Sequence, residues 1–347
     1  MQSRSIGFIS AVAGLVMAAQ PGLAREELTA VTALEQNNTL TRGFLATYVK
    51  PVNDTGKGVV TIKYLGGQEV VPPDKAANAL RRGQFDILSG PASYWVGQFP
   101  EAYAFLASNQ GPKQMRANGS WKMMQEIVEK RLGVHLLAWG HSMTSYYMML
   151  SKEPKLNKEG LPDLTGIKMR ATGTYRPLFR ALGATTINIK SSELFTALER
   201  GTVDGLGFTD VTIPGLGVTK YAKYRVLPNF YNTNTVEFVN LEVWKSLSEK
   251  QRQLMTAQAI KFETDSVHWI EAERLKEDVQ SKKEGMVEFV LKGAAAKRYV
   301  DLAHEEIWKE YKTRAPESHD QLKNLMYIPG KPDRQANIPS ASERLRD

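Results

Sequence analysis

The stretch that decides the fold is residues 164–208, which read LTGIKMRATGTYRPLFRALGATTINIKSSELFTALERGTVDGLGF. Its first apolar residues alternate with Lys168 and Arg170, the period of a strand with one buried face, so Arg170 is expected at the strand's end on the face away from the core. The whole stretch is typical of β-α-β-α-β, with predicted elements at 167–171, 175–182, 187–189, 191–200 and 203–208. Ligands in open α/β sheets bind beyond the carboxyl ends of strands, so we expect Arg170, Thr172 and Phe208 to share one crevice.

Part of this stretch recurs earlier in the chain. Residues 79–88, ALRRGQFDIL, match residues 197–206, ALERGTVDGL, as A-L-x-R-G-x-apolar-D-x-L. Each segment is typical of a helix end, a glycine cap and a strand. A basic residue followed by glycine is also a common helix stop, but the length of the match favours two lobes built on one scheme, with a ligand between them.

Three motifs carry a family resemblance: LTGIKMR at 164–170, LGA at 182–184 and SELFTALERGTVDG at 192–205. Together they resemble the DctP-type periplasmic solute-binding subunits of TRAP (tripartite ATP-independent periplasmic) transporters, closely in the middle of the chain and more loosely elsewhere. The resemblance implies an α/β fold with the two-lobe, Venus-flytrap architecture of periplasmic binding proteins. It also implies an organic-acid ligand and, as partners, the integral membrane permease subunits of a transporter driven by an ion gradient.

The composition and the missing motifs exclude several functions. The net charge of +8 is spread along 347 residues without a basic block, which argues against dedicated nucleic-acid binding. There is no cysteine, and the five histidines show no metal-binding spacing. Neither a nucleophile elbow nor a phosphate-binding loop is present, so we expect no cofactor, no metal and no catalysis. A periplasmic enzyme that acts on carboxylates through Arg170 and His141 is the rival interpretation.

The first residues predict the compartment. Arg4 precedes an apolar run at 6–19, and Gly22-Leu23-Ala24 places small residues before a cleavage point. Residues 1–24 are therefore predicted to be a cleaved signal peptide, which would place the mature protein in the periplasm. A membrane anchor is the alternative, but the run is shorter than the roughly 20 residues of a spanning helix.

The predicted lobes are discontinuous in sequence. Lobe 1 is expected to comprise residues 25–143 plus about 232–262, lobe 2 residues 144–231 plus about 263–328, and 329–347 a polar tail. The strands at 224–227 and 235–240 would both return towards lobe 1. A capping box at Ser248 and Gln251 opens a long helix, predicted to run to Glu284 and to bridge both lobes, with its charged end at 271–284 in solvent.

Further candidate ligand contacts follow three other predicted strands. Asn38 lies in a polar turn after the first strand, and Ser93 and Tyr94 follow the strand at 85–88. His141 follows the strand that ends at Trp139. Asn38 could equally be a plain turn residue, and Tyr94 could begin the next helix and pack into the core.

Departures from the family pattern predict the kind of acid. Many relatives carry a second arginine where this chain has His141-Ser142-Met143, and a polar Q-E-N where it has Leu206-Gly207-Phe208. One cation, Arg170, expected to pair bidentately with a carboxylate, favours monocarboxylates such as 2-oxo or 2-hydroxy acids, aromatic ones included, over dicarboxylates. His141 would supply a second charge if protonated. A binding protein that serves a sensor or an ATP-driven importer would show the same sequence features.

Overall fold

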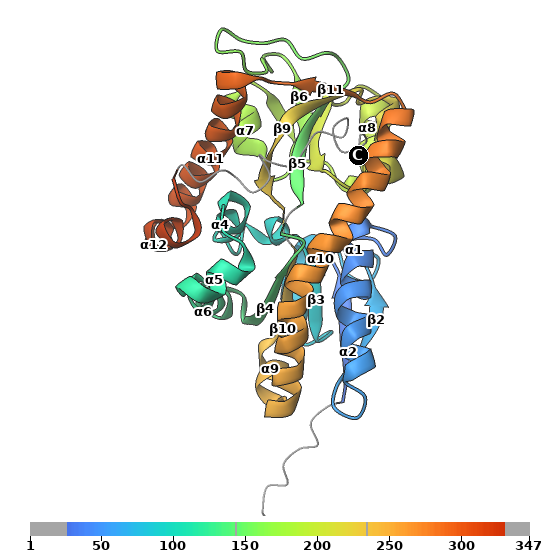
Figure 1. Cartoon of the computed structure of the whole chain (residues 1–347), viewed down its shortest axis with the longest axis vertical. Helices are drawn as coiled ribbons and strands as arrows, with labels where there is room; N and C mark the ends of the chain where they lie inside the picture. Colours follow the sequence, from blue (N-terminus) through green and yellow to red (C-terminus); the bar gives the residue numbers. More distant parts are fainter. Residues whose placement is uncertain (1–25, 143, 234, 330–347) are drawn as a thin grey trace, which may run out of the picture.

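The computed structural model describes residues 26–142, 144–233 and 235–329, which form two lobes, each built on its own β-sheet (Figure 1). The predicted signal peptide and nearly all of the predicted polar tail lie outside the described residues. The α/β, two-lobe fold class is confirmed. Within the described residues, no helix is both long enough and apolar enough to cross a membrane.

The lower lobe in Figure 1, lobe 1, contains a five-stranded sheet in the order β2-β1-β3-β10-β4. Strand β1 is parallel to β2 and β3, whereas β10 runs antiparallel to β3 and β4. The strands are β1 (Glu27–Thr32), β2 (Thr61–Gly66), β3 (Ile87–Gly90), β4 (Val134–Gly140) and β10 (Thr235–Asn240). The helices are α1 (Thr39–Phe44), which continues through a π-helical turn into α2 (Lys50–Thr55), α3 (Pro73–Arg81), α4 (Ala102–Ala107), α5 (Pro112–Asn118), α6 (Ser120–Leu132) and α9 (Leu241–Ser246).

Lobe 2 contains a six-stranded sheet in the order β11-β9-β5-β8-β6-β7. The strands are β5 (Ser145–Leu150), β6 (Lys168–Arg170), β7 (Thr185–Ile187), β8 (Gly205–Thr209), β9 (Tyr224–Asn232) and β11 (Val287–Val290). The helices are α7 (Arg176–Ala181), α8 (Leu194–Glu199) and α11 (Gly293–Arg314), and α12 (Pro316–Met326) follows α11 along the chain. The predicted β-α-β-α-β order is therefore confirmed as β6-α7-β7-α8-β8, although β7 lies two residues earlier than the predicted 187–189.

The sequence repeat corresponds to the same hydrogen bond in both lobes, in which an aspartate before one strand accepts from the backbone of the neighbouring parallel strand. In lobe 1, Asp86 before β3 accepts a hydrogen bond of 2.7 Å from the backbone N–H of Thr29 on β1. In lobe 2, Asp204 before β8 accepts one of 2.8 Å from the N–H of Lys168 on β6. Each aspartate thus holds the start of its strand beside a parallel neighbour. As a result, the carboxyl ends of β1 and β3 lie side by side in lobe 1, and those of β6 and β8 lie side by side in lobe 2.

Helix α10 (Glu249–Lys283) connects the lobes and begins with the predicted capping box (Figure 1). Its first half packs Met255, Ala259 and Phe262 into the lobe 1 core. The expectation that 271–284 is solvated was wrong for one face of the helix, on which Arg274 and Asp278 are buried. That face lies against lobe 2, because Arg274 Nε is 2.8 Å from Asp210 Oδ2 and Asp278 Oδ1 is 2.9 Å from Arg225 Nη1.

Two segments lie elsewhere than the local pattern suggested. Strand β9 does not return to lobe 1, because it is paired between β5 and β11 in the lobe 2 sheet. Helix α12, which the sequence did not predict, lies against α4, α5 and α6, and Ser108 Oγ after α4 donates a 2.7 Å hydrogen bond to the Met326 carbonyl. The lobe boundaries drawn from the sequence stay a prediction.

Candidate functional site

A small cavity of about 40 Å³ lies between the lobes and is lined by residues from both. On this measure one water molecule needs about 10–15 Å³, so the present conformation has room for only a few waters. Its lining comprises Leu34, Asn38, Leu40, Pro91, Ser93, Tyr94, Tyr146, Arg170, Thr172, Tyr175, Phe208 and Thr209. Six of the seven candidates chosen from the sequence are in this set, and His141 is not.

The cavity lies at the carboxyl ends of two parallel strand pairs, β1 with β3 in lobe 1 and β6 with β8 in lobe 2. In lobe 1, Asn38 follows β1, and Ser93 and Tyr94 follow β3. In lobe 2, Arg170 ends β6 and Phe208 lies near the end of β8. These positions meet because β1 is parallel to β3 and β6 is parallel to β8.

Arg170 is the only cation among the described residues that line the cavity, and the structure buries it, leaving it 3% exposed. The residue thus ends β6 at the cavity, as expected, but in a buried rather than an exposed position. Its Nε donates to the Ile189 carbonyl at 2.9 Å, and its Nη1 donates to the Gly207 carbonyl at 3.0 Å and to the Tyr175 hydroxyl. Within the described residues, Nη2 has no hydrogen-bond partner and no carboxylate pairs with the guanidinium.

Tyr175 is a cavity residue that sequence reasoning missed, because it was assigned to the helix that follows β6. Its hydroxyl oxygen accepts from Arg170 Nη1, which leaves the hydroxyl proton available for donation. Its ring packs against Gly207, where a Cβ would approach ring carbons of Tyr175 to 2.6 Å. A glycine two residues after the V-D-G motif was the signal that a bulky side chain crosses β8 at this point.

The lobe 1 side of the cavity supplies neutral polar groups. Asn38 Oδ1 caps α1 by accepting from the N–H of Leu40 at 2.9 Å, while its Nδ2 makes no hydrogen bond within the described residues. The Ser93 and Tyr146 hydroxyls interact. Burial raises the pKa of Tyr94 to about 12, although the nearby charge of Arg170 opposes this shift, so the phenol stays protonated at neutral pH. Asn38 is thus a capping residue that also lines the cavity, and its contact with a ligand stays a prediction.

His141 is turned away from this cavity. Its φ of 55° directs the ring into the contact between β10 and α10, where Nδ1 lies 2.8 Å from Thr235 Oγ1 and the ring meets Phe262 edge-on. Burial lowers the pKa of His141 to about 3, so the side chain is neutral at physiological pH. The structure therefore gives no support to His141 as a second cation. Trp139, two residues before His141, packs on Phe105 in the lobe 1 core.

The chemistry of the lining is that of one cation among aromatic rings and hydroxyl groups. The Phe208 ring centre lies 5.5 Å from Arg170 Cζ, and no Asp or Glu is among the lining residues that the structure describes. Among the described residues, no group of three His, Asp or Glu side chains is arranged to hold a metal ion. An anionic group with an apolar body is the ligand that such a lining can stabilise.

The fold and the cavity between its lobes define a two-lobe α/β binding protein. Residues 31–314 match the DctP family, described as bacterial extracellular solute-binding protein, family 7. The chain therefore belongs to this family of TRAP-type periplasmic binding proteins.

Individual relatives are distant. The monocarboxylate 2-oxoacid-binding periplasmic protein of Nostoc sp. is 24% identical over 220 residues, which are 60% of this chain and 58% of that protein. An uncharacterised Haemophilus influenzae protein is 24% identical over 205 residues, 57% of this chain and 58% of the relative. The chain thus spans 58% of the length of each of these curated relatives.

Solved structures show the same fold. A TRAP periplasmic solute-binding protein of Desulfovibrio salexigens with bound orotic acid superposes with a TM-score of 0.75 at 19% identity, covering 87% of this chain and 97% of that one. A Bordetella bronchiseptica TRAP solute-binding protein with calcium and picolinate in its active site has a TM-score of 0.75 at 18% identity, covering 87% and 91%. At these identities the likeness shows the fold alone.

Proposed function

We propose that this protein captures a small organic monocarboxylate between its lobes and delivers it to the membrane subunits of a TRAP-type transporter. The observation that carries the proposal is the buried Arg170, which has an unused Nη2 at the cavity and no acidic partner within the described residues. A buried charge normally requires a partner, and a ligand carboxylate provides one.

The donors around Arg170 define how the carboxylate is held. Since Nε and Nη1 already donate to protein oxygens, the bidentate guanidinium fork expected from the sequence is replaced by two different donors. One carboxylate oxygen accepts from Arg170 Nη2 and the other from the Tyr175 hydroxyl. That hydroxyl accepts a hydrogen bond from the guanidinium, and this polarises it and strengthens the hydrogen bond that it donates. Both donors come from lobe 2.

The rest of the lining selects one carboxylate over two. The described part of the lining contains no second cation, so a second buried carboxylate would remain unpaired at a cost of several kcal/mol. Phe208 and Tyr94 suit an apolar or aromatic body, and Asn38 Nδ2 is placed to donate to a 2-oxo or 2-hydroxy oxygen. The name of the Nostoc relative, a monocarboxylate 2-oxoacid-binding protein, supports this class.

Delivery follows from closure. A ligand that contacts both lobes stabilises the closed arrangement over the open one, and the transporter can distinguish the two. The lobe 1 contacts at Asn38 and Tyr94 and the lobe 2 contacts at Arg170 and Tyr175 provide that coupling.

The test is calorimetric titration with paired mono- and dicarboxylates of equal chain length at neutral pH. Arg170→Ala should lose about 2–5 kcal/mol of binding free energy. Arg170→Lys should not restore it, because a single ammonium group cannot donate to the three protein acceptors of the guanidinium and to the ligand at once. Arg200→Ala, which removes an exposed arginine of the same lobe, is the matched control. Unchanged affinity in Arg170→Ala would overturn the anchor, whereas a C4 dicarboxylate binding about tenfold tighter than its monocarboxylate analogue would overturn only the ligand class.

A further inference from the structure

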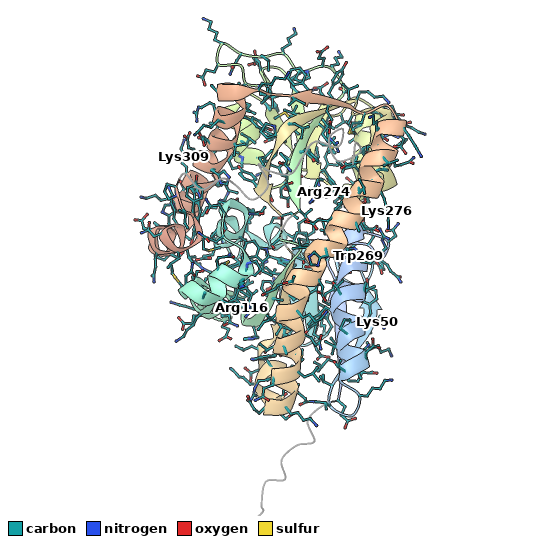
Figure 2. All side chains as sticks on the ribbon, in the orientation of Figure 1. Lys50, Arg116, Trp269, Arg274, Lys276 and Lys309 are labelled. Carbon is teal, nitrogen blue, oxygen red and sulfur yellow. The ribbon has the colours of Figure 1, made fainter. Side chains whose placement is uncertain are left out.

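A second and larger hollow lies outside the ligand cavity, between α7 and α11. It measures about 240 Å³, and Lys309 on its α11 side is labelled in Figure 2. Its lining comprises Tyr103, Gly173, Arg176, Pro177, Arg180, Ala181, Glu306, Lys309, Glu310, Thr313 and Arg314. We call it the α7–α11 groove.

The charges of the groove do not cancel. It is lined by four cationic side chains and two carboxylates. Both carboxylates are already paired on α11, because Arg314 Nε is 2.5 Å from Glu310 Oε1 and Lys309 Nζ is 3.7 Å from Glu306 Oε1. Two positive charges, those of Arg176 and Arg180, therefore remain uncompensated by the groove's own acids.

Arg176 and Arg180 are placed to act together. They lie four residues apart on α7, so they project from the same face of the helix. Within the described residues neither guanidinium group makes a hydrogen bond or an ion pair, although Arg176 is partly buried. Like charges at this spacing repel each other, so an anion that binds both arginines would relieve a cost that the free protein carries.

The groove also joins the two lobes. Tyr103 comes from α4 of lobe 1, and its hydroxyl donates to the carbonyl of Gly173 in lobe 2 at 3.4 Å. Gly173 directly follows Thr172, which lines the ligand cavity. The loop that carries these two residues thus faces the ligand cavity on one side and the groove on the other.

We propose that the α7–α11 groove is a second binding site, specific for multivalent oxyanions that carry carboxylate or phosphate groups. Two unpaired guanidinium groups one helical turn apart suit two oxyanion groups of one ligand, because each planar fork can donate two parallel hydrogen bonds. The same chemistry is offered by a free polyanion and by neighbouring acidic side chains of a partner protein. Since the groove contains residues of both lobes, occupancy should favour the closed form and so strengthen solute binding reciprocally.

The experiment titrates the purified full chain at low ionic strength with two probes, inorganic pyrophosphate and a hexaglutamate peptide. The double variant Arg176→Gln/Arg180→Gln is compared with Lys63→Gln/Lys250→Gln, which removes two exposed charges of lobe 1 that have no ion pair within the described residues. Saturable binding of either probe should weaken about tenfold or more in the first variant and about twofold or less in the second. If only hexaglutamate behaves in this way, the site recognises acidic side chains of a partner; if only pyrophosphate does, it recognises free polyanions.

Two results would overturn the inference. One is the absence of saturable binding of both probes, and the other is an equal loss in both double variants, which indicates a general charge effect. The Arg170→Ala variant keeps this test separate from the proposed function, because binding that is lost there but retained in Arg176→Gln/Arg180→Gln would place the anion in the ligand cavity. Should the double variant unfold, the single exposed change Arg180→Gln gives the same reading with a smaller loss.

Discussion

At the scale of single residues, the candidate site depends on how Arg170 is held. Three protein acceptors, two carbonyl groups and the Tyr175 hydroxyl, fix the guanidinium on its Nε and Nη1 atoms. An arginine held in this way loses little conformational freedom when a ligand binds, so more of the interaction energy contributes to affinity. Tyr175 is thus both a positioning residue for Arg170 and, in our proposal, a donor to the ligand.

Removing the Tyr175 hydroxyl tests that double role. Tyr175→Phe should weaken monocarboxylate binding by about 1.5–3 kcal/mol, since a hydrogen bond to a charged group is lost while the ring that packs on Gly207 is retained. Tyr224→Phe, on a lobe 2 strand outside the cavity, is the control. Calorimetry on both variants measures the change, and a Tyr175→Phe affinity equal to that of the wild type would show that the hydroxyl neither donates to the ligand nor orients Arg170 for binding.

At the scale of elements, α10 fixes lobe 2 through buried ion pairs. Arg274 and Asp210 are 4% and 0% exposed at their side chains, and Arg274 is labelled in Figure 2 where α10 passes between the lobes. Asp210 follows the end of β8, so the pair joins the long helix to the strand that carries Phe208. Buried pairs of this kind define a unique arrangement, because neither charge tolerates the loss of its partner.

The variant Arg274→Met should lower the free energy of unfolding by about 3–5 kcal/mol, because Asp210 would be left as an unpaired buried charge. Lys261→Met on the same helix breaks the exposed i,i+4 pair with Asp265 and should cost no more than about 0.5 kcal/mol. Urea unfolding followed by circular dichroism measures both changes. Equal, small losses would mean that the Arg274 pair contributes no more than a surface pair.

At the scale of the whole molecule, the lobes are joined by the two chain crossings, after β4 and after β9, by α10, and by the packing of α12 on α4, α5 and α6. The crossings are tied together by a 2.6 Å hydrogen bond from the Thr233 N–H to the Thr144 carbonyl, and the first is tied to α10 by a 2.9 Å bond from the His141 N–H to Ser266 Oγ. On α10, Glu277 bridges the lobes, accepting from Thr39 Oγ1 at 3.0 Å and from the Ile213 N–H at 3.1 Å. Movement of the lobes must therefore change the surroundings of Glu277.

This bridge predicts a pH dependence. Burial, opposed by hydrogen bonds from Thr39 and the Ile213 backbone, raises the pKa of Glu277 to about 7, above its value of about 4.3 in an unfolded chain. A raised folded-state pKa contributes stability that is fully present below the unfolded pKa and is lost as pH rises through the folded pKa. Between about pH 4.5 and 7, the wild type should therefore lose up to about 3 kcal/mol relative to Glu277→Gln.

Urea unfolding at several pH values from 5 to about 8 measures that difference. Glu271→Gln, an exposed position on the same helix, should run parallel to the wild type throughout. If Glu277→Gln also runs parallel to the wild type, the carboxyl group titrates normally in the folded protein and the bridge is not strained by its charge.

The sequence by itself determined the central β-α-β-α-β unit, the start of α10 and which loops meet at the cavity. These follow from local signals, because hydrophobic period, glycine caps and a capping box act within a few residues. The strand-end rule for α/β sheets then placed Asn38, Ser93, Tyr94, Arg170, Thr172 and Phe208 together without any knowledge of contacts.

Only the tertiary structure decided the orientation of side chains and the pairing of distant segments. His141 turned away because its positive φ directs the ring towards α10, and Tyr175 turned inward because Gly207, on another strand, leaves room for its ring. The charged face of α10 became buried because Asp210 and Arg225, at least 49 residues away in the chain, neutralise it. These side-chain orientations and ion pairs depend on residues that are distant in the sequence and are brought together by packing. A local sequence pattern therefore does not predict them.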